Sequence, residues 1–99
     1  MAQTNRIGRH MTTIESINGR IYVRYWDTDV VQFDNQWITL DHGGYKTQTT
    51  KLRMNQTASQ FGLGFGVYQK NYKWFVTCPQ GDVIPWGSGR RVTLSRIKQ

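Results

Sequence analysis

Apolar and polar residues alternate along most of the chain, and groups of turn-forming residues interrupt this alternation at short intervals. In the stretch 20–26, Ile21, Val23 and Tyr25 lie on one face of an extended chain, and the residues between them lie on the other. Turn residues that recur about every 8–12 residues are typical of short antiparallel strands. The pattern therefore predicts a chain rich in β-structure.

The predicted strands form successive hairpins. Asn18 and Gly19 separate the stretches 12–17 and 20–26, and both residue types tolerate the positive φ that a two-residue turn requires. We expect three further pairs of strands: 30–33 with 37–40, 65–70 with 72–77, and 82–86 with 90–97.

One segment, residues 49–61, is expected to be helical because it lacks Gly and Pro and is followed by Gly62, a common helix stop. Leu52 points away from the narrow apolar face, which consists of Met54, Ala58 and Phe61. A helix segregated from antiparallel strands defines the α+β class. We therefore predict a single α+β domain over residues 1–99, with about six or seven strands in a mostly antiparallel sheet and one central helix. Residues 1–10 are expected to form a flexible N-terminal arm.

Length and composition agree with one small folded domain. The chain has 99 residues, of which 13% are aromatic. The large rings add buried apolar surface to a core that would be small if only the aliphatic residues formed it. The one cysteine, Cys78, excludes an intrachain disulfide and a cysteine-based zinc site. We expect no signal peptide and no membrane-spanning segment, because no apolar run approaches the required length.

The chain is strongly basic, with a net charge of +7. This balance predicts a phosphate-rich or acidic partner and excludes an acidic mimic of DNA. The charge is also segregated: residues 27–41 contain four Asp and no Lys or Arg, whereas the flanks carry all 13 Lys and Arg. We therefore expect an acidic edge on an otherwise basic surface.

The segment 43–53 is a candidate anion site at the start of the predicted helix. Two glycines are followed by hydroxyls and cations, of which we select Lys46, Thr49, Thr50, Lys51 and Arg53. A helix N-terminus favours anions, so cations there oppose the helix dipole unless a bound phosphate or carboxylate offsets them. The alternative is an ordinary threonine N-cap with solvated cations. The spacing is not that of a Walker-type phosphate loop.

Cations and aromatic rings are interleaved in the predicted hairpin 65–77. Tyr68, Lys70, Tyr72, Lys73 and Trp74 follow one another closely, as in proteins that stack bases on rings and contact phosphates with lysines. Alternatively, most of these rings pack in the core, as we expect for Trp74.

A second cationic stretch begins with Arg90 and Arg91 near the C-terminus, and we include both among the candidate anion-binding residues.

A metal-dependent nuclease is a weaker hypothesis. Four carboxylates, with His42 beside the last, could hold a metal: Asp27, Asp29, Asp34 and Asp41. Three of the four occupy predicted turns, where Asp is favoured for local hydrogen bonds. We therefore predict no catalytic residue, no metal site, no cofactor and no enzymatic activity.

The central sequence is similar to that of a known group of proteins. The strings TDVVQF from residue 28, ITLDHGGYKTQTTKLRMNQ from residue 38, and VYQ followed by WFV from residue 67 resemble small bacteriophage- and plasmid-encoded proteins of unassigned function. The resemblance implies a viral origin and a location in the host cytoplasm. It implies no catalytic residue.

Two functions are compatible with these observations. The first is nucleic-acid binding with low sequence specificity through a cationic, aromatic surface. The second is a non-catalytic accessory or counter-defence role, in which the chain binds an acidic host protein or a nucleotide-like ligand. We expect no membrane partner. We also expect a homodimer or larger symmetric oligomer, because a chain of this size leaves strand edges and rings exposed.

Overall fold

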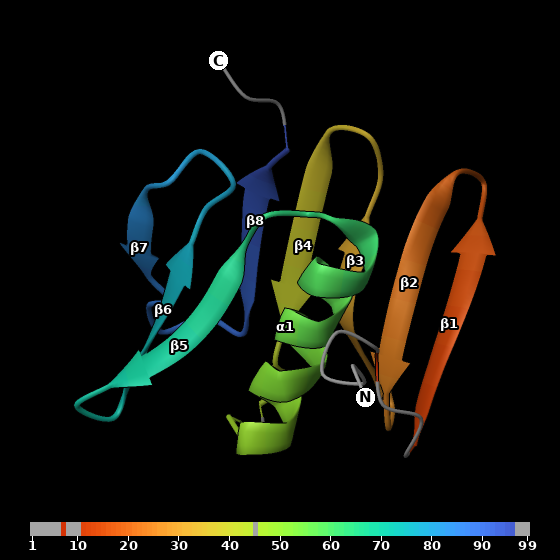
Figure 1. Ribbon diagram of the computed structural model, residues 1–99. Helices are drawn as coiled ribbons and strands as arrows, with labels where there is room; N and C mark the ends of the chain where they lie inside the picture. Colours follow the sequence, from red (N-terminus) through yellow and green to blue (C-terminus); the bar gives the residue numbers. More distant parts are fainter. Residues whose placement is uncertain (1–6, 8–10, 45, 97–99) are drawn as a thin grey trace, which may run out of the picture.

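Eight strands and one helix make up the described part of the computed structural model, which comprises residue 7, residues 11–44 and residues 46–96 (Figure 1). In chain order they are β1 (Thr12–Ile17), β2 (Arg20–Tyr25), β3 (Thr28–Phe33), β4 (Trp37–Asp41), α1 (Gln48–Phe61), β5 (Gly66–Lys70), β6 (Lys73–Thr77), β7 (Val83–Pro85) and β8 (Arg91–Ser95). Helix α1 is too short and too polar to cross a membrane, and the described residues contain no other helix.

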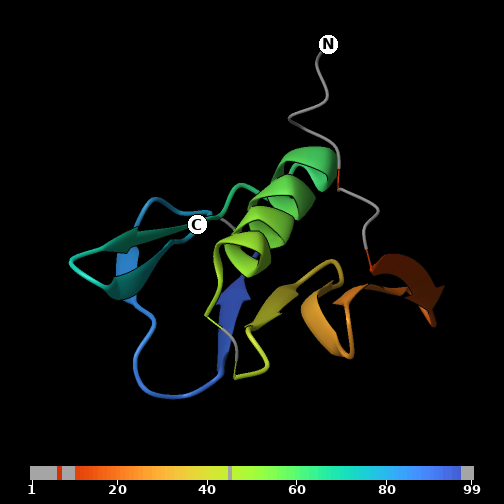
Figure 2. The ribbon, with the colours of Figure 1, turned by 90° about the horizontal axis from the view of Figure 1, so that it is seen from below.

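The strands form two antiparallel sheets. One has five strands in the order β1-β2-β3-β4-β8, and the other has three in the order β5-β6-β7. Helix α1 lies across one face of the five-stranded sheet, and the β5–β6 hairpin projects away from it in both views (Figures 1 and 2). The predicted α+β class is confirmed, although the strands divide into two sheets.

The last predicted hairpin is wrong. Strand β7 pairs with β6, whereas β8 crosses to the other sheet and pairs with β4. The pairing places Leu94 opposite Ile38 and Val92 opposite Leu40. The apolar face of β8 thereby joins the larger core, which a local hairpin with β7 would not allow.

The helix begins and ends at the expected types of residue. The Oγ1 of Thr47 accepts a hydrogen bond from the Thr50 N–H, which is an N-cap, and the helix starts one residue earlier than predicted. Gly62 has φ 64°, and the Leu63 N–H donates to the Ala58 carbonyl at 2.9 Å. Gly62 is therefore the predicted helix stop, in the left-handed conformation that glycine adopts at low cost.

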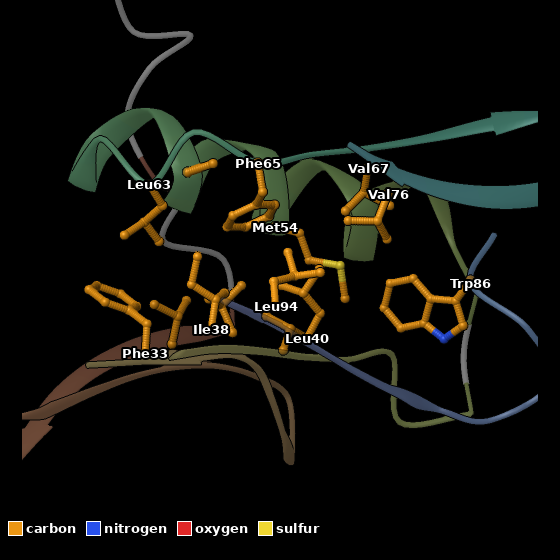
Figure 3. Packing of buried hydrophobic residues seen from close by; sticks show 14 of the residues in the cluster. Phe33, Ile38, Leu40, Met54, Leu63, Phe65, Val67, Val76, Trp86 and Leu94 are labelled. Atoms are coloured by element: carbon orange, nitrogen blue, oxygen red, sulfur yellow. The ribbon is translucent and has the colours of Figure 1, made fainter. Parts of the chain in front are cut away.

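The core lies between the five-stranded sheet on one side and α1 with the smaller sheet on the other (Figure 3). Ile38 and Leu40 point from β4 toward Met54 of α1, and all three are fully buried. Leu52 faces solvent with 48% of its surface exposed, so the predicted orientation of the helix is confirmed. Trp74 lies in the core, as expected.

The predicted flexible arm over residues 1–10 lies outside the described residues except at Ile7. That residue is buried, and its N–H donates to the side-chain oxygen of Gln60 at 3.1 Å.

Candidate functional site

The candidate residues from the sequence occupy three separate places in the fold. Lys46, Thr49, Thr50, Lys51 and Arg53 lie at the start of α1; Tyr68, Lys70 and Lys73 lie on the β5–β6 hairpin; Arg90 and Arg91 lie at the start of β8. The first two groups meet at one contact, between Lys51 of α1 and Gln69 of β5. Each group has to be judged by its own contacts.

At the start of α1, side-chain contacts already occupy most of the candidate residues. Thr50 is buried and shares a hydrogen bond with Thr47, so it belongs to the N-cap. The Nζ of Lys51 donates to the Gln69 side chain at 3.1 Å and lies 5.6 Å from the centre of the Trp74 ring. Lys51 therefore links α1 to the smaller sheet. Lys46 is exposed, and Thr49 is half-buried.

Arg53 does not fit the predicted anion site. Only 6% of its surface is exposed, and its guanidinium donates to the side-chain oxygens of Thr12 and Gln56. The guanidinium also lies 5.5 Å from the centre of the Tyr25 ring, which is a cation–π contact. Arg53 therefore fastens α1 to β1 and β2, and the expected role as an exposed cation is corrected.

Arg90 and Arg91 are both paired with one carboxylate. The buried Asp41 accepts hydrogen bonds from two guanidinium nitrogens of Arg90 at 3.0 Å and from Arg91 at 2.9 Å. It also accepts from the Gly43 N–H at 2.7 Å. These arginines hold the turn after β4 against the start of β8. Because Asp41 neutralises part of their charge, they are weak candidates for phosphate contacts.

The predicted acidic edge does not form. Asp34 pairs with Arg20, Asp29 pairs with Arg24, and Asp41 pairs with Arg90 and Arg91. The partners come from other strands, and antiparallel pairing brings them beside the acidic segment. Within the described residues, no three His, Cys, Asp or Glu side chains gather closely enough to hold a metal ion.

Replacing Asp41 with asparagine should make the free energy of unfolding depend less on pH between neutral pH and about pH 2. Burial alone raises the pKa of Asp41, but hydrogen bonds from Arg90, Arg91 and the Gly43 N–H outweigh it, so the pKa lies below its ordinary value of 3.8. The ionised carboxylate therefore stabilises the fold above that pH, and this contribution disappears as the pH falls through the lowered pKa. Urea denaturation from neutral pH to about pH 2 measures the effect.

The Asp41→Asn protein should be less stable than the parent at neutral pH and should lose less on acidification. Asp82→Asn, which changes an exposed carboxylate, is the control and should keep the parent profile. An unchanged acid slope in Asp41→Asn would contradict the structural role of this carboxylate.

The outward face of the smaller sheet brings one predicted group together. Alternation along β5 and β6 places Tyr68, Lys70, Lys73 and Phe75 on the face opposite the buried Val67, Trp74 and Val76. The rings of Tyr68 and Phe75 are cross-strand neighbours and stack, with centres 5.4 Å apart and planes 21° apart. Lys70 and Lys73 are paired in the next position toward the turn. Phe75 was not predicted, although its alternation with Trp74 could have revealed it.

Tyr72 lies next to Lys73, at the tip of the same hairpin. Asn71 and Tyr72 form a two-residue turn in which both have positive φ, 53° and 67°. The turn between β1 and β2 has the same form, with Asn18 at 51° and Gly19 at 81°. Tyr72 therefore occupies the position at which the other turn has glycine, and 94% of its surface is exposed. We call Tyr68, Lys70, Tyr72, Lys73 and Phe75 the aromatic–lysine face.

Comparison with known proteins identifies a phage family. The family model described as Kyanoviridae Gp96 protein matches residues 1–93. No curated protein and no solved structure matches the chain. The family match confirms the phage origin inferred from the resemblance of the central strings. Because it covers nearly the whole chain, the protein belongs to the Kyanoviridae Gp96 family of phage proteins.

Proposed function

We propose that this phage protein binds single-stranded nucleic acid with little sequence preference through the aromatic–lysine face. The observation that carries the proposal is the position of Tyr72, a large ring held in solvent at a turn position that favours glycine. Left-handed backbone costs a non-glycine residue about 1–2 kcal/mol. Among the described residues, Tyr72 has no ring contact that offsets this cost. Strained residues of this kind are concentrated at functional sites.

The chemistry of the face suits an unpaired strand. Each base has a flat face that stacks on an aromatic ring whatever its sequence, and one such contact contributes about 1–3 kcal/mol. Tyr68 is supported from the side by Phe75, and Tyr72 extends beyond it at the tip of the hairpin. Lys70 and Lys73 lie between these two rings, where they can contact the phosphates that link successive bases. The net charge of +7 steers the strand toward the protein.

A charge-reversal experiment tests whether binding depends on this face or only on net charge. Lys70→Glu/Lys73→Glu and the control Arg9→Glu/Lys98→Glu change the net charge equally, but the control changes residues near the two ends of the sequence. Fluorescence anisotropy with a labelled single-stranded oligonucleotide gives the affinity over a range of salt concentrations. Loss of two phosphate contacts should reduce the slope of log K against log salt by about 1.4. The control should keep a slope close to that of the parent.

Tyr72→Gly separates binding from stability. This change removes the ring and gives the turn the Asn-Gly sequence of the β1–β2 hairpin. The variant should unfold no more easily than the parent, while its affinity for the oligonucleotide should fall about 5- to 150-fold, as expected for one lost stacking contact. Equal weakening by both double variants, or unchanged affinity in Tyr72→Gly, would overturn the proposal.

A second candidate function, binding to a host protein as an accessory factor, is favoured by the other end of the same sheet face. Val83 and Pro85 on β7 continue this face beyond Phe75 and are exposed, with no charged side chain between them. A partner retained in stoichiometric amount after nuclease treatment of a host lysate would favour this role. Loss of every partner on nuclease treatment would favour nucleic-acid binding.

A further inference from the structure

Strand β1 forms the outer edge of the five-stranded sheet, at the end of the molecule away from the smaller sheet (Figures 1 and 2). The outer side of an edge strand presents N–H and C=O groups that can pair with a strand of another molecule. The two sheets have four such edges, formed by β1, β8, β5 and β7. The four edges differ in how far contacts within the described part of the chain already occupy them.

Three of these edges are protected against further pairing. On β5, the N–H and the C=O of Val67 are bonded to the side chain of Asn55 at 2.8 and 2.9 Å. Strand β7 has only three residues, and one of them, Pro85, has no N–H to donate. On β8, the side chain of Gln80 donates to the Ser95 carbonyl at 2.9 Å. Short strands, proline and covering side chains are the means by which proteins prevent edge-to-edge association.

Strand β1 has none of these protections. Five of its six residues are exposed, and it contains no Lys, Arg or Pro. Ile17 and Arg20 flank a two-residue turn and therefore form a hydrogen-bonded pair, so the backbone groups of every second residue from Ile17 point toward β2. The N–H and C=O groups of Ile14 and Ser16 consequently point away from the sheet. They have no hydrogen-bond partner among the described residues.

The exposed apolar side chains along this edge are arranged symmetrically about Ile14. Met11, Ile14 and Ile17 follow one another at intervals of three residues, with 46%, 46% and 50% of their surface exposed. In an antiparallel pair of two copies with Ile14 at the two-fold axis, Ile14 lies opposite the same residue of the second copy. In that register Ile17 lies beside Met11 of the second copy. All three apolar side chains of each chain are then covered by those of the other.

The charges along the edge favour the same register. Glu15 is the one charged residue of β1, and pairing about Ile14 places it opposite Thr13 of the second copy. Pairing about Glu15 would instead place two carboxylates directly opposite each other, which destabilises a sheet. Arg24 lies opposite Thr13 on β2, so the row that contains Glu15 of one copy continues to Arg24 of the other. Charges of opposite sign therefore flank the proposed contact on both sides of the axis.

We propose that two copies of this protein pair through β1, antiparallel and centred on Ile14, to form one continuous sheet with five strands from each copy. The two Ile14 residues exchange two backbone hydrogen bonds at the axis. The aromatic–lysine face of each copy lies on the smaller sheet and stays accessible, so the dimer does not depend on the proposed function. The contact involves one strand of each chain and is smaller than most specific interfaces. We therefore expect a reversible dimer that dissociates at micromolar concentration.

Sedimentation velocity over a range from low micromolar to millimolar concentration tests the association. The parent protein should change from monomer to dimer as its concentration rises. Ile14→Lys places two positive charges opposite each other at the axis and should remain monomeric throughout. Leu52→Lys adds the same charge at an equally exposed apolar position on α1 and should dimerise as the parent does. Circular dichroism at the lowest concentration should show the same folded spectrum for all three proteins.

Disulfide cross-linking tests the register, in chains that carry Cys78→Ser to remove the native thiol. Thr13 and Glu15 of the two copies form a non-hydrogen-bonded pair, in which the Cα atoms are about 4.5 Å apart and a disulfide can form. A mixture of Thr13→Cys and Glu15→Cys chains should therefore give a mixed disulfide dimer, and either chain alone should cross-link far less. The proposal is wrong if the parent stays monomeric at millimolar concentration, if Ile14→Lys dimerises as the parent does, or if the mixed disulfide is not preferred.

Discussion

Replacing Met54 with alanine is expected to lower the free energy of unfolding by about 2–5 kcal/mol, the range observed when a large buried side chain leaves a cavity. Met54 is fully buried between α1 and the five-stranded sheet, where Ile38 and Leu40 approach it from β4 (Figure 3). Because the free energy of unfolding of a small domain is about 5–15 kcal/mol, this substitution removes a large part of it. Urea denaturation followed by tryptophan fluorescence measures it.

Leu52→Ala is the matched control for Met54→Ala. It lies two residues away on the same helix, faces solvent, and has a comparable change in side-chain size. We expect an effect within about 0.5 kcal/mol, because exposed substitutions rarely alter stability by more. Equal destabilisation by the two variants would mean that α1 does not pack through the Met54 face.

Replacing Asn55 with alanine should destabilise the protein by about 2–6 kcal/mol and also weaken nucleic-acid binding. The Asn55 side chain accepts from the Val67 N–H at 2.8 Å and donates to the Val67 carbonyl at 2.9 Å. Val67 is buried, so the truncation leaves two backbone groups without a partner, each costing about 1–3 kcal/mol. The next residue, Tyr68, belongs to the aromatic–lysine face, and its position depends on this contact.

Two further variants separate the two hydrogen bonds from general effects on α1. Asn55→Asp keeps the acceptor but not the donor, so it should lie between the parent and Asn55→Ala in stability. Ser59→Ala changes an exposed residue of the same helix and should match the parent in both stability and oligonucleotide affinity. If Asn55→Ala binds the oligonucleotide as tightly as the parent under conditions in which it is folded, β5 does not need this anchor.

Local sequence was sufficient to predict most elements because their boundaries depend on neighbouring residues. The Asn18-Gly19 turn, the helix stop at Gly62 and the solvent-facing Leu52 all follow from backbone preferences or from periodicity over a few residues. The sequence also predicts the turn at Asn71, although it predicts that Tyr72 begins the next strand, whereas Tyr72 belongs to the turn. The positive φ of Tyr72, at the position that Gly19 has in the other turn, is a property of the folded backbone and does not follow from the residue type.

The pairing of β8 could not be predicted from local sequence. A hairpin between residues 82–86 and 90–97 requires only a short loop, whereas the observed pair joins β8 to β4 across the whole of α1 and the smaller sheet. The pairing of β8 with β4 is the more stable one because Val92 and Leu94 complete the apolar face around Leu40 and Ile38. The stabilisation from buried apolar surface depends on all the contacts in the core. A few neighbouring residues do not determine those contacts.

The sequence by itself determined the α+β class, the turns, the helix and the basic character of this protein, because each depends on composition or on residues close together in the chain. Only the tertiary structure decided which charges are free. Arg53, Arg90 and Arg91 resemble exposed cations in the sequence, yet each meets partners more than 40 residues away, whereas Lys70 and Lys73 remain beside exposed rings. An ion pair or a cavity wall requires side chains from distant segments to meet within a few ångströms, and only folding of the whole chain creates that proximity.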